Sequence, residues 1–235
     1  MKRNVSVLLP ALVVALILAV PAWAGQPKVL EATVPAAGLE LVRLDAGVGD
    51  IEISGADVAE IALRVELEPR RGGFFSSMKT AQREVDRAEL RTEVSGGELV
   101  VEIDTDGGDR RFEEHWTIQV PAQLAFTLEL GVGDVEVRGV TGALDLELGV
   151  GDVLVEGVAG DVTVEIGVGD ATVIGRAEHY GSVDGSGGVG DARLTVRGER
   201  VESSGFVGHS AEWSGDGPHR IEISVGVGNA KVTLE

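Results

Sequence analysis

A tetrapeptide of the form Gly-Val-Gly-Asp recurs along the chain, and its aspartate is the residue best suited to chemistry. The regular copies place the carboxylates at Asp134, Asp152, Asp170 and Asp191. Hard oxygen ligands of this kind suit calcium. An aspartate at a bend can instead hydrogen-bond nearby backbone amides without any metal. We favour this structural role for all four residues and keep a calcium column along them as the alternative.

The even spacing of these tetrapeptides predicts stacked coils. The central valines, or their counterparts, stand at positions 132, 150, 168, 189, 207 and 227, so each coil has about 18–21 residues. Between corners, apolar and polar residues alternate with the period of a β-strand. The apolar positions expected to face inward include Leu144, Leu146, Leu148, Val150 and Val168. One coil cannot bury its apolar side alone, so the coils must stack over a shared core.

The predicted fold is therefore all-β: a single-domain β-solenoid over residues 25–235, similar to a right-handed parallel β-helix. Its most regular coils cover about 126–235. The glycines and aspartates expected to form structural corners are Gly131, Gly133, Asp134, Gly149, Gly151, Asp152, Gly167, Gly169, Asp170, Gly188, Gly190 and Asp191. Glycine permits the backbone conformation that a tight bend needs.

The first half is less regular and contains one predicted helix. Met78, Ala81, Val85 and Ala88 recur at three- and four-residue steps, which indicates a short amphipathic helical insertion at about 76–90. The adjacent phenylalanines at 74–75 could form a contact patch. We expect them rather to pack the helix against the solenoid.

Residues 1–24 have the order of a secretory signal peptide. Lys2 and Arg3 precede an apolar run over residues 5–20, and Ala22-Trp23-Ala24 fits a cleavage site. We expect an exported, secreted protein of the periplasm, cell envelope or cell surface, with no membrane span after cleavage. The chain has no cysteine, so disulfides are excluded.

The balance of charge restricts the partners. With 20 Lys+Arg and 39 Asp+Glu, the formal net charge is −19, which repels nucleic acids and anionic lipids. A protein or another envelope component is the expected partner, and self-association stays open. Glu129, Glu147 and Glu165 should form a second acidic column on an outward face, continued by Ser186 and Ser204.

Other chemical motifs carry less weight. Ser76 and Lys79 match Ser-x-x-Lys without the other elements of such a site, and Ser76 suits a helix N-cap. Residues 185–190 match a dinucleotide fingerprint but belong to the repeat. A metal site at His179 and His219 is the weaker interpretation of two surface histidines. No catalytic residue and no cofactor-binding residue are predicted.

One stretch resembles a known family. Residues 116–121 (WTIQVP) lead into residues 128–137 (LELGVGDVEV), and the pattern then repeats. This resembles the bacterial putative-adhesin β-repeat proteins of unknown function, also called toastrack-like domains. The resemblance implies a β-helical fold and a binding or scaffold role at the cell envelope. It implies no catalytic residues.

These observations favour a non-enzymatic, adhesin-like binding module that presents an acidic β-solenoid surface. One alternative is a self-associating envelope scaffold, because the sequence ends inside a coil at 231–235, where exposed strand edges could pair with another molecule. A second alternative is a polysaccharide-active β-helix enzyme. Such an enzyme needs acids paired with bases and usually aromatic platforms, which this sequence does not place in register.

Overall fold

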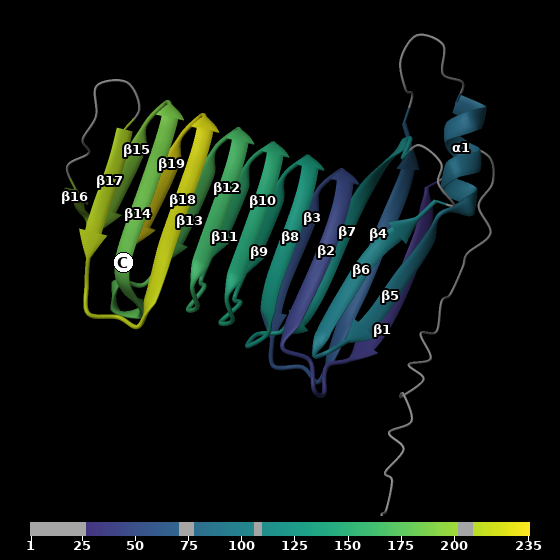
Figure 1. Ribbon diagram of the computed structural model, residues 1–235, viewed down its shortest axis with the longest axis horizontal. Helices are drawn as coiled ribbons and strands as arrows, with labels where there is room; N and C mark the ends of the chain where they lie inside the picture. The colour runs from purple at the N-terminus through teal and green to yellow at the C-terminus, as the bar shows by residue number, and fades with distance from the viewer. Residues whose placement is uncertain (1–26, 71–77, 106–109, 202–208) are drawn as a thin grey trace, which may run out of the picture.

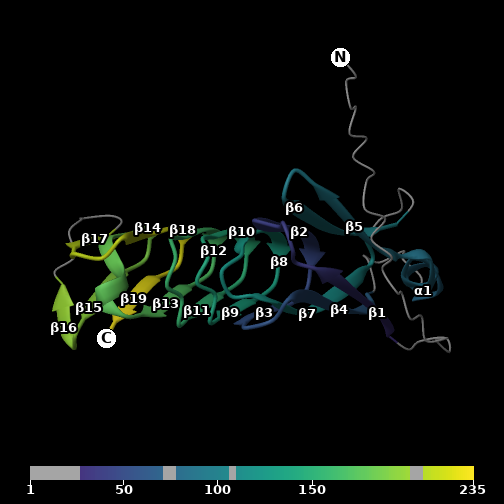
Figure 2. The ribbon, with the colours of Figure 1, turned by 90° about the horizontal axis from the view of Figure 1, so that it is seen from below.

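Two β-sheets lie face to face along the molecule, and one α-helix lies at one end (Figures 1 and 2). The computed structural model describes residues 27–70, 78–105, 110–201 and 209–235. The predicted signal peptide, residues 74–76, Ser204 and the degenerate corner at position 207 lie outside the described residues.

The described strands form a ten-stranded sheet and a nine-stranded sheet. In spatial order, the ten-stranded sheet contains β1 (Lys28–Pro35), β4 (Glu60–Pro69), β7 (Phe112–Pro121), β3 (Ile51–Ala56), β9 (Val135–Arg138), β11 (Val153–Glu156), β13 (Ala171–Gly175), β19 (Ala230–Leu234), β15 (Ala192–Val196) and β16 (Glu199–Val201). The nine-stranded sheet contains β17 (His209–Ser214), β14 (Tyr180–Val189), β18 (His219–Val227), β12 (Val162–Val168), β10 (Leu144–Val150), β8 (Ala125–Val132), β2 (Leu41–Val48), β6 (Glu98–Asp104) and β5 (Glu89–Ser95).

The centre of the molecule is a stack of rungs. We call a rung one strand of the nine-stranded sheet, a Gly-Val-Gly-Asp or Gly-Val-Gly-Asn corner, and the following strand of the ten-stranded sheet. In spatial order the rungs are β2–β3, β8–β9, β10–β11, β12–β13, β18–β19 and β14–β15. Neighbouring rungs pair in parallel, with Val150 in register with both Val132 and Val168. Corners far apart in sequence therefore lie directly beside one another.

The order of the last rungs differs from the order of the sequence. Strand β18 pairs with β12 on one side and β14 on the other, so the last rung lies between two earlier ones. Strand β14 has Gly185 and Gly187 at buried positions that β18 fills with Ile223 and Val225. The poorer core of β14 thus lies at the end of the stack, where the antiparallel strand β17 flanks it. Strand β19 is internal, so the expected exposed edge in the last coil is wrong.

The all-β prediction with one short helix is confirmed, but the sheets are mixed. Antiparallel pairs flank the stack: β1 with β4, β4 with β7, β5 with β6, β14 with β17, and β15 with β16. A right-handed parallel β-helix would contain parallel pairs throughout. The ends depart from it because antiparallel strands flank the stack there, only β5–β6 and β15–β16 being hairpins of consecutive strands.

Helix α1 (Met78–Arg87) packs on β4 and β7. Ala81, Val85 and Ala88 are buried as predicted, whereas Met78 is exposed. The Lys28 ammonium group donates to the backbone carbonyls of Asp86 and Ala88, at 2.9 and 2.7 Å. These carbonyls are at the helix C-terminus, where a positive charge is stabilising.

The inward pattern of the strands is confirmed up to the corner and wrong at the corner itself. Leu144, Leu146 and Leu148 are buried, but Val150 and Val168 are 46% and 47% exposed. The chain begins to turn at the first corner glycine, so the strand alternation ends one residue earlier than expected. The valine between the two glycines then lies on the outside of the bend.

The second corner glycine should be intolerant of any side chain. Gly151 has φ +145°, and a Cβ there would lie 1.8 Å from the carbonyl oxygen of Gly133 in the next rung. We expect Gly151→Ala to lower the free energy of unfolding by about 3 kcal/mol or more, through backbone strain and displacement of the neighbouring rung. Chemical denaturation measures this value. The matched control is Gly198→Ala, where φ is +82° but nothing lies within 4 Å; equal losses in the two variants would contradict the steric explanation.

Candidate functional site

The corners stack so closely that the second glycine of each has no room for a side chain, and the first glycine of each corner after Gly47 has none either. In Gly133, Gly151, Gly169 and Gly190, φ lies between +145° and +146°. The first glycines of the corners are equally confined: a Cβ on Gly149 would lie 2.5 Å from the carbonyl oxygen of Gly131. The first glycines at 131, 167, 188 and 226 have the same kind of contact, whereas Gly47 in the first corner does not.

The corner aspartates form a hydrogen-bonded ladder across the rungs. We call Asp50, Asp134, Asp152, Asp170, Asn229 and Asp191, in spatial order, the aspartate ladder. The Asp152 backbone N–H donates to Asp134 Oδ1 at 2.9 Å, and the Asp170 backbone N–H donates to Asp152 Oδ1 at 2.8 Å. Each carboxylate thus accepts the amide of the next rung, not an amide of its own turn as the sequence indicated. The side chain supplies an acceptor for this amide at the corner.

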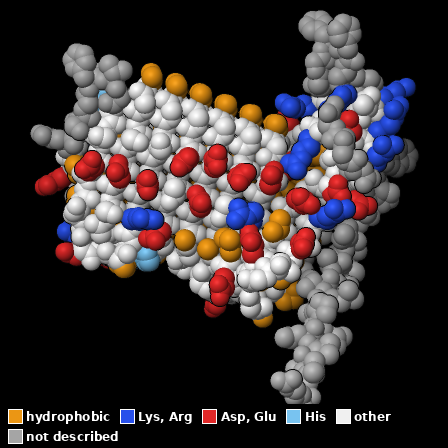
Figure 3. All heavy atoms as spheres, viewed as in Figure 1, with side chains coloured by type: hydrophobic (Ala, Val, Ile, Leu, Met, Phe, Trp, Pro, Cys, Tyr) orange, Lys and Arg blue, Asp and Glu red, His pale blue; other side chains and the backbone are white. Residues whose placement is uncertain are grey.

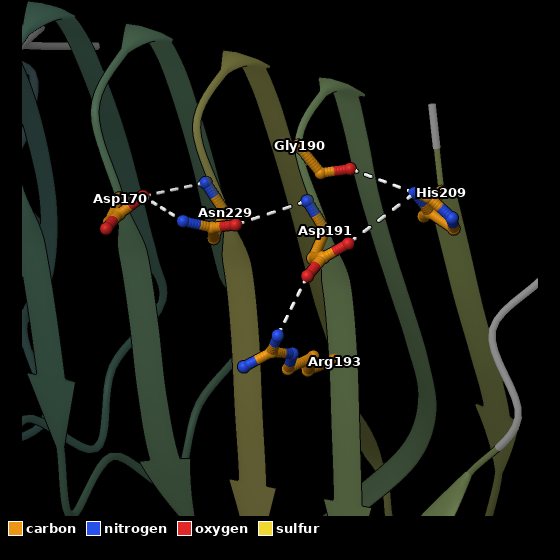
Figure 4. Close-up of polar contacts among 6 residues, drawn as sticks. All are labelled: Asp170, Gly190, Asp191, Arg193, His209 and Asn229. Atoms are coloured by element: carbon orange, nitrogen blue, oxygen red, sulfur yellow. Dashed lines mark hydrogen bonds and ion pairs between the residues drawn. The ribbon is translucent and has the colours of Figure 1, made fainter. Parts of the chain in front are cut away.

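An asparagine interrupts the run of negative charges near one end of the ladder (Figure 4). Asp170 Oδ1 accepts from both the backbone N–H and the side-chain amide of Asn229, at 2.7 and 2.8 Å. The side-chain oxygen of Asn229 then accepts from the Asp191 backbone N–H at 3.2 Å. The amide continues the ladder while removing one of the stacked charges, which repel one another.

Basic side chains lie at both ends of the ladder. At one end, His115 Nδ1 is 3.5 Å from Asp50 Oδ2. At the other, Arg193 donates to Asp191 Oδ2 at 2.8 Å, and His209 Nδ1 is 3.0 Å from the Gly190 carbonyl oxygen (Figure 4). Within the aspartate ladder the carboxylates are thus engaged by amides, and at its ends by basic groups.

This geometry gives the alternative interpretation, a calcium column, no coordinating cluster. Over the described ranges, no group of three or more His, Asp or Glu side chains converges in a way that could hold a metal ion. The ladder aspartates instead line a shallow groove of about 550 Å³ along the ten-stranded sheet, together with outward residues such as Glu136 and Leu154.

The outer face of the nine-stranded sheet is strongly acidic (Figure 3). We call Asp45, Glu129, Glu147 and Glu165 the glutamate column; they are exposed and in register on β2, β8, β10 and β12. Ser224 and then Ser186 continue the column. A second row of outward-facing residues runs beside the column on the same face. It contains the exposed residues Asp145, Glu222 and Asp184, and its other members are mostly uncharged. Arg43, the cation on this row, is paired with Glu98 at 2.7 Å.

The outer face of the ten-stranded sheet carries mixed charge. Arg138 pairs with Glu136 and with Glu156, the latter at 3.2 Å. Lys231 and Arg193 lie in register on neighbouring strands. The two faces of the molecule therefore differ in electrostatic character.

A straight row of apolar side chains follows the corner edge between the two faces (Figure 3). We call Val48, Val132, Val150, Val168, Val227 and Val189, in spatial order, the valine ridge. Their Cα atoms are in register from rung to rung. The last five are 46–63% exposed. Sequence reasoning placed two of these valines inside, so this surface was missed.

One carboxyl group is buried beside the first corner. Glu114 on β7 is 1% exposed, accepts from Trp116 Nε1 at 2.9 Å and from the Gly47 backbone N–H at 3.3 Å, and lies 3.9 Å from Arg110. Burial raises the pKa of Glu114, while the Trp116 hydrogen bond, Arg110 and the Gly47 N–H oppose the rise. Glu114 is a charged residue in the middle of a strand, and such a residue is expected to face solvent. The sequence therefore did not indicate its burial.

The remaining predicted residues assemble no site. The 3₁₀ turn Ala177–His179 places His179 next to Tyr180, which is in register with His219. His219 Nδ1 lies 3.4 Å from Asp161, and among the described residues no group that could hold a metal ion forms around it. Residues 185–190 span the end of β14 and the following corner, and strand β15 follows. Lys79 lies in α1. None of the described helices is long and apolar enough to cross a membrane.

Comparison with known proteins supports the fold. No protein-family model and no curated protein matches the sequence. A solved structure described as a putative cell adhesion protein from Clostridium sporogenes aligns with 89% of this chain and 100% of its own, with a TM-score of 0.61 and 21% sequence identity. A putative adhesin from Bacteroides fragilis covers 87% of this chain and 97% of its own at 15% identity, with a TM-score of 0.32. The resemblance indicated by the sequence is thus supported at the level of the fold, by the first of these structures.

The aspartate ladder predicts opposite outcomes for two substitutions at one position. Asp152→Ala removes the acceptor for the Asp170 N–H and should lower the free energy of unfolding by about 1 kcal/mol. Asp152→Asn keeps an acceptor oxygen and removes a stacked charge, as Asn229 does, and should change stability by less than about 0.5 kcal/mol or raise it slightly. Urea denaturation at low salt measures both values. Equal destabilisation by the two variants would refute the hydrogen-bonding role of the side chain.

Glu114 should contribute a characteristic pH dependence. Because its pKa is raised in the folded protein, this group's stabilising contribution is fully present below its unfolded pKa and is lost as pH rises through the folded pKa. Glu114→Gln should abolish this pH-dependent part of the stability. It should also lower the free energy of unfolding by about 1–3 kcal/mol, because the amide nitrogen of Gln must face one of the two N–H donors. Denaturation across the acidic range measures both effects, with the partly exposed neighbour substituted as Glu113→Gln for comparison. A pH profile unchanged by Glu114→Gln would contradict the assignment.

Proposed function

We propose that this protein is a non-enzymatic, adhesin-like binding module of the cell envelope or extracellular space, and that its acidic sheet face meets a cationic protein partner. The glutamate column is the observation that carries the proposal. It places four exposed carboxylates in register on adjacent strands. Neighbouring strands lie about 4.8 Å apart, so the face offers a regular array of negative charge.

Three of the four carboxylates in the glutamate column are available for a partner, whereas Asp45 lies 3.4 Å from Arg110. Among the described residues, Glu129, Glu147 and Glu165 have no Lys or Arg within ion-pair distance, whereas the opposite face pairs its carboxylates with Arg138. Repulsion between aligned carboxylates is relieved when a cationic surface approaches, which favours association and accelerates it. The stacked rungs, which we regard as a β-solenoid, would hold this array rigid.

The location rests on the signal-peptide pattern of residues 1–24 and on the fold. The Clostridium sporogenes structure shares that fold and is described as a putative cell adhesion protein. This supports an envelope role without assigning a partner. The scaffold alternative loses the argument made for it, because β19 is internal. The polysaccharide-enzyme alternative gains no support from the aspartate ladder, whose carboxylates are engaged in structural bonds.

A matched pair of triple variants tests the proposal. The probe is a fluorescent peptide of about twelve lysines, titrated at about 0.05 M and about 0.5 M salt. Glu129→Gln, Glu147→Gln and Glu165→Gln together should weaken binding at least about fivefold at low salt, and the difference should shrink at high salt.

The control removes the same number of charges from the opposite face, outside the groove that the ladder aspartates line: Glu31→Gln, Glu66→Gln and Glu156→Gln together. We expect less than about a twofold effect. If both triple variants weaken binding equally, the peptide responds to net charge alone and the proposed face is wrong.

A further inference from the structure

The valine ridge exposes apolar side chains where the fold does not need them. Val132, Val150 and Val168 are nearly half exposed, and each lies between two glycines on the outside of the bend. A threonine has a similar shape and strand propensity, so the corner geometry alone does not call for valine. The described corners nevertheless all carry it. Repeated exposed apolar groups in one line are typical of a contact surface.

Acid-lined grooves flank the ridge on both sides. On the side of the ten-stranded sheet, the groove of about 550 Å³ contains the ladder residues Asp50, Asp134, Asp152 and Asp170. On the other side, a groove of about 310 Å³ lies over Gly131 and Gly149 and is bordered by Asp45, Glu129 and Glu147. The missing glycine side chains leave this second groove open. The surface is thus an apolar line between two negatively charged margins.

These margins restrict the occupant. A second copy placed ridge against ridge would bring together margins whose acidic groups outnumber the few cations at their ends, and an anionic membrane would be repelled in the same way. A partner with an apolar stripe between two rows of Lys or Arg matches both features. The charges therefore favour a basic polypeptide.

The spacing of the ridge favours a helix over an extended strand. Six valines at the strand separation of about 4.8 Å span about 24 Å. Apolar residues at alternating three- and four-residue steps of a helix advance about 5 Å each, and about 16 residues cover 24 Å. Side chains on one face of an extended strand are separated by about 6.6 Å and fall out of register with the valines.

We propose that the valine ridge is the docking line for a basic amphipathic α-helix of a partner protein. The apolar stripe of the helix lies along the ridge, and its flanking Lys and Arg side chains reach the two acidic grooves. This inference rests on the proposed binding function and specifies the chemistry of the partner.

The test uses a designed peptide of about 18 residues with Leu at three- and four-residue steps and Lys on both flanks. A scrambled peptide of identical composition lacks the stripe. Wild-type protein should bind the patterned peptide at least about tenfold more tightly and induce helical circular dichroism in it. Val150→Ser with Val168→Ser should weaken this binding at least about tenfold and leave binding of the scrambled peptide unchanged.

Two further variants separate the apolar contact from side effects. Val150→Thr with Val168→Thr preserves shape and strand propensity and should also weaken binding of the patterned peptide. Met78→Ser with Val94→Ser alters two exposed apolar residues away from the ridge, 37% and 45% exposed, and should have no effect. Melting curves verify that each variant is folded.

The outcomes distinguish this inference from the proposed function. One outcome is that the patterned and scrambled peptides bind equally well, and that binding is weakened by the Glu129, Glu147 and Glu165 variant but not by the valine variants. This outcome would support binding at the acidic face and overturn the proposed helix docking. A dimer in analytical ultracentrifugation that the valine variants dissociate would overturn it in favour of a second copy. Binding to vesicles of anionic phospholipid that the valine variants abolish would overturn it in favour of a membrane.

Discussion

The close approach of backbones at the corners is the constraint on which the rest of the structure depends. The second glycine of each corner lies against the carbonyl of its neighbour, where a Cβ would be less than 2 Å from the oxygen. Only a residue without a side chain permits the rungs to stay paired through the bend. The same bend turns the valine outward and brings each aspartate within reach of the next amide. The ridge, the ladder and the two grooves are thus consequences of one steric requirement.

Charge is distributed around this constraint in two ways. Carboxylates of the aspartate ladder are used internally, as acceptors for corner amides, and basic groups occupy both ends. Carboxylates of the glutamate column are at the same spacing but have no such role, and they remain exposed. The two columns lie on opposite sides of the valine ridge. One acidic column therefore contributes hydrogen bonds to the fold, and the other remains exposed on the outer face of the nine-stranded sheet.

The sequence predicted the rungs because the valine spacing and the strand alternation both report local geometry. Leu144, Leu146 and Leu148 followed that rule and are buried. Val150 did not, because the turn starts at Gly149 and the two-residue period no longer applies there. The spatial order of the last two rungs could not be predicted from local sequence patterns either. Every rung offers similar apolar columns, and only the small residues Gly185 and Gly187 of β14 hint at its outer position. Glu114 escaped prediction because its burial depends on β7 meeting a corner that lies 67 residues earlier in the chain.

The β18–β19 rung lies between two rungs that precede it in the sequence, and this position has a consequence for how the chain folds. Rungs β8–β9, β10–β11 and β12–β13 can assemble in order as a nascent chain emerges, since each pairs with its predecessor. The β14–β15 rung emerges next, yet its parallel neighbour in both sheets is synthesised after it. A premature β12–β14 pairing would have to dissociate before the final rung could enter. This topology predicts a kinetic trap late in folding, with the unpaired edge of β12 and β13 as the surface that a chaperone would need to protect.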